Sequence, residues 1–223
     1  MSMKIAVPIV VLGLILASIA LFGVRIPPGS PSTEPPIASP DAPKQERFVK
    51  VWVGDTFPDF EVERVDGGTY KLSRDRDAQK FTIINMHSPD CPCAANCASL
   101  INDMEASGVK DVEVIGILAG VRVDEDFIKR AQDQVDEGLV TFRLYTDPEN
   151  KVRNMLDAKR TPTVWVLDKA GKVAFVGAPE NTLFPGSPGH RYLLRDALEA
   201  LRAGKVPDPQ FFEPLGCPID PNA

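Results

Sequence analysis

The sequence has no surplus of basic residues, because 25 lysines and arginines stand against 31 aspartates and glutamates for a formal net charge of −6. A chain of this charge does not attract nucleic-acid phosphates, so we exclude nucleic acid as a partner. No internal repeat is visible, and with 43% hydrophobic residues the composition excludes a disordered or collagenous chain. Cysteine is scarce, at four residues, yet three of the four lie within seven positions.

The N-terminus carries a long uncharged apolar run between Lys4 and Arg25. As a helix, its twenty residues span about 30 Å, the thickness of a bilayer hydrocarbon core. We therefore expect a transmembrane anchor within residues 1–25, with a cleavable signal sequence as the alternative. There is no lipobox cysteine, which excludes a lipoprotein. The basic N-terminal side predicts that the remainder lies outside the cytoplasm, in the periplasm if the source is bacterial.

Two proline-rich segments flank the central part of the sequence. Residues 26–46 contain seven prolines, a composition that cannot pack a core and favours extended polyproline II. Residues 205–223 contain five prolines together with Cys217. We therefore expect a linker at 26–46, one domain at 47–204 and a proline-rich tail at 205–223.

The central part alternates between short apolar runs, typical of strands, and longer periodic runs, typical of helices. A turn that contains glycine joins the two strands of each of two predicted hairpins. This order of elements predicts an α/β fold whose mixed sheet is covered by helices on both sides. The expected strands are 60–65, 69–72, 81–86, 112–118, 142–145, 163–167 and 172–176, and the expected helices are 93–107, 126–137, 150–156 and 192–203.

Three cysteines, Cys91, Cys93 and Cys97, lie between a predicted buried strand and a predicted helix. The free N–H groups and the dipole at a helix N-terminus stabilise an anion, so a thiol placed there loses its proton more readily. Because the thiolate is the attacking species in disulfide exchange, this cluster indicates a dithiol redox site.

Three segments resemble the thioredoxin-like superfamily, in the redoxin branch (AhpC/TSA-like or TlpA-like) of bacterial membrane-anchored thiol–disulfide proteins. They are residues 54–60, the strand that leads to Cys91, and Thr161-Pro162-Thr163 ahead of a further strand. The resemblance implies a thioredoxin-like fold, Cys91 as the nucleophile, and a substrate-facing cis-proline at Pro162 beside Thr161. It also implies protein or small-molecule thiols and disulfides as substrates, with no cofactor.

The chain departs from the usual C-x-x-C spacing, since Ala94 occupies the position of the second cysteine. Cys93 lies one residue closer to Cys91, and a disulfide between these two closes a small, strained ring. Asn85 stands where thioredoxins bury a carboxylate, which removes that proton acceptor. We expect the charge of Asp90, adjacent to the nucleophile, to oppose thiolate formation.

Cys217 admits three interpretations. The tail folds back so that Cys217 resolves the disulfide started at Cys91, or the thiol is unpaired, or it forms a structural disulfide with Cys97. Cys93 is the other candidate for the resolving thiol. Four cysteines allow three complete pairings, and the sequence does not choose among them.

The two histidines carry weaker signals. His87 is the last residue of the predicted buried strand and lies close to the cysteines. Its functional interpretation is proton transfer or metal binding, and the alternative is a polar residue at the end of a strand with no role in the chemistry. His190 follows a Gly/Pro-rich loop, and we expect it to be exposed to solvent.

Three functions follow from these features. The first is a membrane-anchored thiol–disulfide oxidoreductase that uses Cys91, with Cys93 or Cys217 as the resolving thiol. The second is a peroxiredoxin-type thiol peroxidase, although its P-x-x-x-T-x-x-C motif meets Ile84 and Ser88 here. The third is a copper chaperone resembling the Sco type, with Cys93, Cys97 and His190 as ligands, because soft thiolates select Cu(I).

Overall fold

The computed structural model describes residues 49–106 and 110–220. The expected anchor at 1–25 and the expected linker at 26–46 lie outside these residues. Among the helices of the described ranges, none is long and apolar enough to cross a membrane.

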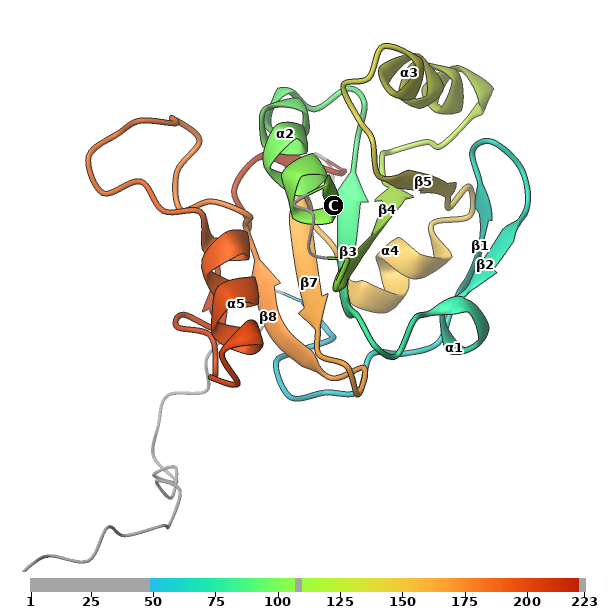
Figure 1. The fold of residues 1–223 in the computed structure, drawn as a ribbon. Helices are drawn as coiled ribbons and strands as arrows, with labels where there is room; N and C mark the ends of the chain where they lie inside the picture. Colours follow the sequence, from blue (N-terminus) through green and yellow to red (C-terminus); the bar gives the residue numbers. More distant parts are fainter. Residues whose placement is uncertain (1–48, 107–109, 221–223) are drawn as a thin grey trace, which may run out of the picture. The chain divides into compact units, whose positions relative to one another are not determined.

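An eight-stranded mixed sheet forms the centre of the structure, in the order β2-β1-β5-β4-β3-β7-β8-β9 (Figure 1). The pairs β3–β4, β4–β5 and β8–β9 are parallel, and the other neighbouring strands are antiparallel. The strands are β1 (Glu61–Arg64), β2 (Thr69–Lys71), β3 (Phe81–His87), β4 (Val112–Leu118), β5 (Arg143–Thr146), β7 (Thr163–Leu167), β8 (Val173–Gly177) and β9 (Phe211–Phe212).

Helices cover both faces of this sheet, so each central strand is buried on two sides. In β3, Ile83 packs in a core with Ile101 from one covering helix, whereas Ile84 packs in a second core with Val152 from another. All seven residues of β3 are buried, which explains its continuous apolar run. The predicted α/β fold, with a mixed sheet covered by helices on both sides, is thereby confirmed. The helices are α1 (Leu72–Asp75), α2 (Pro92–Ala106), α3 (Glu125–Asp136), α4 (Lys151–Leu156) and α5 (Leu193–Arg202).

Residues 205–220 contribute two strands, although their sequence indicates only a tail. The strand β9 extends the main sheet beside β8, and β10 (Cys217–Pro218) pairs with β6 (Arg160–Thr161) in a separate two-stranded sheet. Figure 1 shows this C-terminal segment returning to the middle of the sheet, next to α2. Strands of two residues are too short to show an alternation of apolar and polar residues, so the sequence pattern does not reveal them.

Candidate functional site

The site is built on the turn that joins β3 to α2. Cys91 immediately precedes α2, and Pro92 takes the first helical position, where its missing N–H removes no helical hydrogen bond. The backbone N–H of Cys91 donates to the carbonyl of Ser88 at 3.2 Å. The backbone N–H of Ala94 donates to the Cys91 sulfur at 3.4 Å. The sulfur thus accepts one of the otherwise free donors of the first helical turn.

A second element meets Cys91 from across the fold. The Thr161–Pro162 peptide bond is cis, as the resemblance implies, and both residues are buried. The Cys91 thiol donates to the carbonyl oxygen of Thr161 at 3.1 Å. The predicted nucleophile is therefore in direct contact with Thr161 of the predicted substrate-binding pair, over a sequence separation of 70 residues.

The C-terminal segment brings a third cysteine to this point. Cys217 is the antiparallel ladder partner of Thr161. The sulfur atoms of Cys91, Cys93 and Cys217 all lie within 4.8 Å of one another. All four cysteines are free thiols in this structure, and Cys97 does not belong to the group of three. The tail therefore folds back to Cys91, which is the geometry that the first interpretation of Cys217 requires.

The surroundings give the three thiols different acidities. Burial raises the pKa of the Cys91 thiol, but its interactions with the side chains of Cys217 and Thr161 and with the backbone N–H of Ala94 outweigh burial and bring the pKa below its ordinary value. Burial and the hydrogen bond to Cys91 raise the pKa of Cys217 to about 12. Burial, followed by the charge of Cys91, raises the pKa of Cys93. Cys91 is therefore the thiol that ionises first, and its neighbours remain protonated as hydrogen-bond donors.

The charge of Asp90, which we expect to oppose thiolate formation, is paired in the structure. The Asp90 carboxylate receives two hydrogen bonds from the Arg130 guanidinium of α3, at 2.7 and 2.9 Å. This bidentate pair offsets the negative charge beside Cys91.

The two polar residues on β3 near the site lie in the core. His87 is buried, and its Nε2 lies 2.9 Å from Oε1 of Gln134. Burial lowers the pKa of His87, which keeps the ring neutral. Asn85 is also fully buried, and its amide N and O have no hydrogen-bond partner among the described residues. His87 is accordingly a polar residue that fills the strand end.

The copper ligand set expected at Cys93, Cys97 and His190 is not assembled. Within the described residues, the ligand atoms that form a close group are the three thiols above. The prediction that His190 is exposed is also wrong, since its side chain is 8% exposed and its Nε2 contacts the Glu180 carboxylate. Cys97 donates to the other oxygen of Glu180 at 3.6 Å. Burial, followed by the charge of Glu180, raises the pKa of Cys97.

Glu180 is a residue that the sequence does not single out. Its buried carboxylate connects Cys97 on α2 with His190 in the loop before α5. No local pattern marks a lone glutamate in the loop after a strand, and only the packing of that loop on α2 reveals its role as a link.

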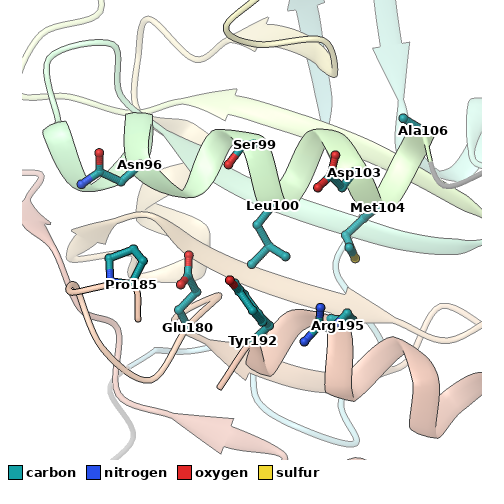
Figure 2. Close-up of a pocket in the computed structure, with 10 residues that line it drawn as sticks. All are labelled: Asn96, Ser99, Leu100, Asp103, Met104, Ala106, Glu180, Pro185, Tyr192 and Arg195. Atoms are coloured by element: carbon teal, nitrogen blue, oxygen red, sulfur yellow. The ribbon is translucent and has the colours of Figure 1, made fainter. Parts of the chain in front are cut away.

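Two cavities adjoin these residues. A cleft of about 340 Å³ lies beside Cys91, between the C-terminal segment and the loop that leads to α3, and both Cys91 and Cys217 line it. A larger one of about 490 Å³ separates α2 from α5, and Figure 2 shows Glu180 and Tyr192 on the side opposite Asn96 and Leu100. No cysteine lines the larger cavity. The smaller cleft is lined by Ser88, Asp90, Cys91, Ala119, Gly120, Val121, Arg122, Asp124, Phe127, Arg130, Thr161, Cys217, Pro218 and Ile219.

A known protein family matches more than half of the chain. The model of the AhpC/TSA family matches residues 53–176. No curated protein matches the chain by sequence.

Three solved structures show the same fold at low sequence identity. An uncharacterised conserved protein from Geobacillus kaustophilus is 22% identical over 78% of this chain and 96% of its own, with a TM-score of 0.67. A hypothetical protein from Sinorhizobium meliloti is 18% identical over 76% of this chain and 94% of its own, with a TM-score of 0.65. A proposed protein disulfide isomerase from Bacteroides thetaiotaomicron is 16% identical over 72% and 92%, with a TM-score of 0.52.

Proposed function

Because the chain belongs to the AhpC/TSA family, we propose that it is a thiol–disulfide oxidoreductase in which Cys91 is the nucleophile and Cys217 the resolving thiol. The observation that carries this proposal is the group of three thiols, with the most acidic of them at the start of α2. A low-pKa thiolate beside a protonated thiol is the arrangement that disulfide exchange requires.

The proposed reaction runs in two exchanges. The Cys91 thiolate attacks one sulfur of a substrate disulfide, forming a mixed disulfide and releasing the other substrate sulfur as a thiolate. Cys217 then gives up its proton to the departing thiolate and attacks the Cys91 sulfur. Breaking the mixed disulfide releases the second substrate sulfur as a thiolate, which takes its proton from water, where Cys91 left its own proton on ionising. The substrate thus gains two electrons from the chain, and the chain keeps a Cys91–Cys217 disulfide. Run backwards, the same steps oxidise a dithiol.

Cys93 is the alternative resolving thiol, since its sulfur lies in the same group. We favour Cys217 because it stands on a separate strand, β10, and closes no small ring with Cys91. A disulfide between Cys91 and Cys93 encloses one intervening residue, and such tight closure departs from the geometry that disulfides prefer.

The proposal includes attachment to a membrane through residues 1–25, with residues 26–46 as the spacer and the domain outside the cytoplasm. The apolar run and the prolines of the sequence support it. Disulfides form and persist in an oxidising compartment, which fits a chain that is proposed to form one between neighbouring thiols.

The peroxidase function is less favoured. The motif that activates peroxide requires a proline and a threonine before the nucleophile, and Ile84 is a fully buried member of β3 where that proline is required. Ser88 retains a hydroxyl at the threonine position, and it is buried.

Binding of a soft metal ion is a second candidate function, and the group of three thiols favours it over the ligand set expected from the sequence. With a Zn–S bond of about 2.3 Å, two sulfur ligands of a tetrahedral site lie roughly 3.8 Å apart. The three sulfur atoms here lie within 4.8 Å of one another, so small movements bring them to that spacing. Thiolates also select Cu(I). Cys91, Cys93 and Cys217 would hold the ion, and Cys97→Ser is the matched control that leaves its affinity unchanged.

One experiment tests the oxidoreductase proposal. The reduced chain is assayed for reduction of the insulin disulfides, and bound metal is measured on the same sample. We expect the unaltered chain and the Cys97→Ser variant to be active and the Cys91→Ser variant to be inactive. The reason is that Cys91 belongs to the group of three thiols and Cys97 does not. Stoichiometric bound metal with no reversible disulfide would overturn the proposal in favour of metal binding, and hydrogen peroxide consumption that depends on Cys91 would favour the peroxidase.

A further inference from the structure

We propose that residues 216–219 are an internal substrate strand. They occupy the backbone edge of β6 on which an extended, cysteine-containing polypeptide pairs, and they must leave this edge before such a polypeptide reaches Cys91. The inference rests on the proposed oxidoreductase function, and it adds the segment of this chain that competes with the substrate for the edge beside Thr161.

The first observation is that Cys91 is covered. The residue is 3% exposed, although the proposed reaction brings a substrate sulfur into contact with its thiol. The C-terminal segment is part of this cover, since Cys217 lies in the same thiol group and pairs with Thr161, the residue whose carbonyl accepts the Cys91 hydrogen bond. Departure of the segment therefore exposes the nucleophile.

The second observation is that backbone pairing holds the segment on β6. Cys217 and Pro218 pair with Thr161 and Arg160. The backbone N–H of Ile219 donates to the carbonyl of Lys159 at 2.8 Å. Main-chain pairing with a strand edge does not depend on the identity of the added strand, so another extended segment can replace this one.

Two side-chain positions of the segment give the site its selectivity. At Gly216 an added Cβ would lie 2.3 Å from the carbonyl oxygen of Thr161 and 3.2 Å from the Cβ of Cys93, and φ is +122°. Ile219 is 3% exposed and packs in the second core, whereas Pro218 between them faces solvent. The site therefore fits the pattern Gly-Cys-x-apolar, with the cysteine delivered to Cys91.

The segment pairs with β6 over so few residues that another strand can replace it. The pairing of β10 with β6 covers two residues, whereas β3 and β4 pair over seven. Regions held by few backbone hydrogen bonds open at a lower free energy than core strands do. A Cys91–Cys217 disulfide would tie the segment to the site, so the oxidised chain is closed to peptides and the reduced chain exchanges.

A peptide-binding measurement tests this proposal without relying on catalysis. The ligand is a fluorescent synthetic peptide of residues 213–220 in which serine replaces Cys217, so that no disulfide forms. Its binding to the reduced full-length chain is followed by fluorescence anisotropy. We expect Gly216→Val to expel the segment and to bind the peptide at least tenfold more tightly than the unaltered chain does.

Controls keep the result interpretable. Ile219→Asp removes the buried anchor and is expected to act like Gly216→Val, whereas Glu213→Ala alters an exposed residue just before the segment and is expected to leave binding unchanged. Circular dichroism checks that each variant is folded. A peptide with valine in place of its glycine is expected not to bind.

The outcomes separate the two proposals. Folded Gly216→Val and Ile219→Asp variants that bind the peptide no better than the unaltered chain would overturn the internal substrate strand, even if disulfide exchange is intact. Tighter peptide binding in both variants supports the strand site, and it does so whether or not the chain exchanges disulfides in the insulin assay.

Discussion

Cys217 is the β-ladder partner of Thr161, and the carbonyl oxygen of Thr161 in turn accepts the hydrogen bond of the Cys91 thiol at 3.1 Å. One residue of the cis-proline loop thus contacts both the proposed nucleophile and the strand that carries the proposed resolving thiol. This shared contact holds the two sulfurs within 4.8 Å of each other. Burial raises the pKa of both thiols, and the hydrogen bond between them then lowers the pKa of Cys91 and raises that of Cys217.

The acidity of Cys91 is expected to depend on the side chain at position 217. Cys217→Ala removes a hydrogen-bond donor from the thiolate, so the pKa of Cys91 is expected to rise and its thiolate fraction at neutral pH to fall. Cys217→Ser retains a donor and is expected to give a smaller shift. The measurement is the pH dependence of Cys91 alkylation by iodoacetamide, followed by mass spectrometry.

That measurement has a clear contrary result. Equal pKa values for Cys91 in the alanine variant and in the unaltered chain would mean that Cys217 does not stabilise the thiolate.

The disulfide formed on mild oxidation is expected to join Cys91 to Cys217, because these sulfurs belong to one group and lie on separate elements. Cys97 is expected to remain reduced and slow to react, since burial and Glu180 disfavour its thiolate. Peptide mapping of the oxidised chain after alkylation measures both results. A bond from Cys97 to Cys217 would contradict the arrangement described above.

Arg130 is expected to support the thiolate indirectly. Arg130→Ala leaves the Asp90 charge uncompensated beside Cys91, so the pKa of Cys91 is expected to rise. Because both partners are about half exposed, stability is expected to change by less than about 1 kcal/mol. The double variant with Asp90→Asn is expected to restore the pKa, which distinguishes a charge effect from a loss of packing.

Gly177, at the end of β8, is expected to be needed for anchoring the C-terminal region. A Cβ at this position would lie 1.8 Å from the backbone oxygen of Phe212, and φ is +142°. Gly177→Ala is therefore expected to separate β9 from β8 and to cost about 1–3 kcal/mol, the usual range for overpacking. Urea unfolding measures the loss, and Gly138→Ala is a control with a positive φ of +72° and open space around its Cβ.

The elements that the sequence predicts well are those that bury many side chains. The strands β3, β4 and β7 fall where continuous apolar runs place them, because a strand covered by helices on both faces needs apolar residues throughout. The short elements α1, β6, β9 and β10 were not predicted. Their two to four residues are ordered by contacts with distant segments and carry no periodicity of their own.

The candidate site divides in the same way. The position of Cys91 at the start of a helix follows from the local sequence, and so does the presence of two further thiols nearby. The pairing of Asp90 with Arg130 and the link from Cys97 through Glu180 to His190 do not, because these partners are 40, 83 and 10 residues apart and meet only in the packed fold.

An α/β domain with three cysteines after a buried strand follows from the amino-acid sequence alone, because hydrophobic periodicity and helix-start chemistry are local properties. Which thiols meet depends on how distant segments pack. It set Cys217 beside Cys91 and left Cys97 bound to Glu180. The physical reason is that the meeting depends on backbone pairing between β10 and β6, which are 56 residues apart and for which no residue type is a reliable marker.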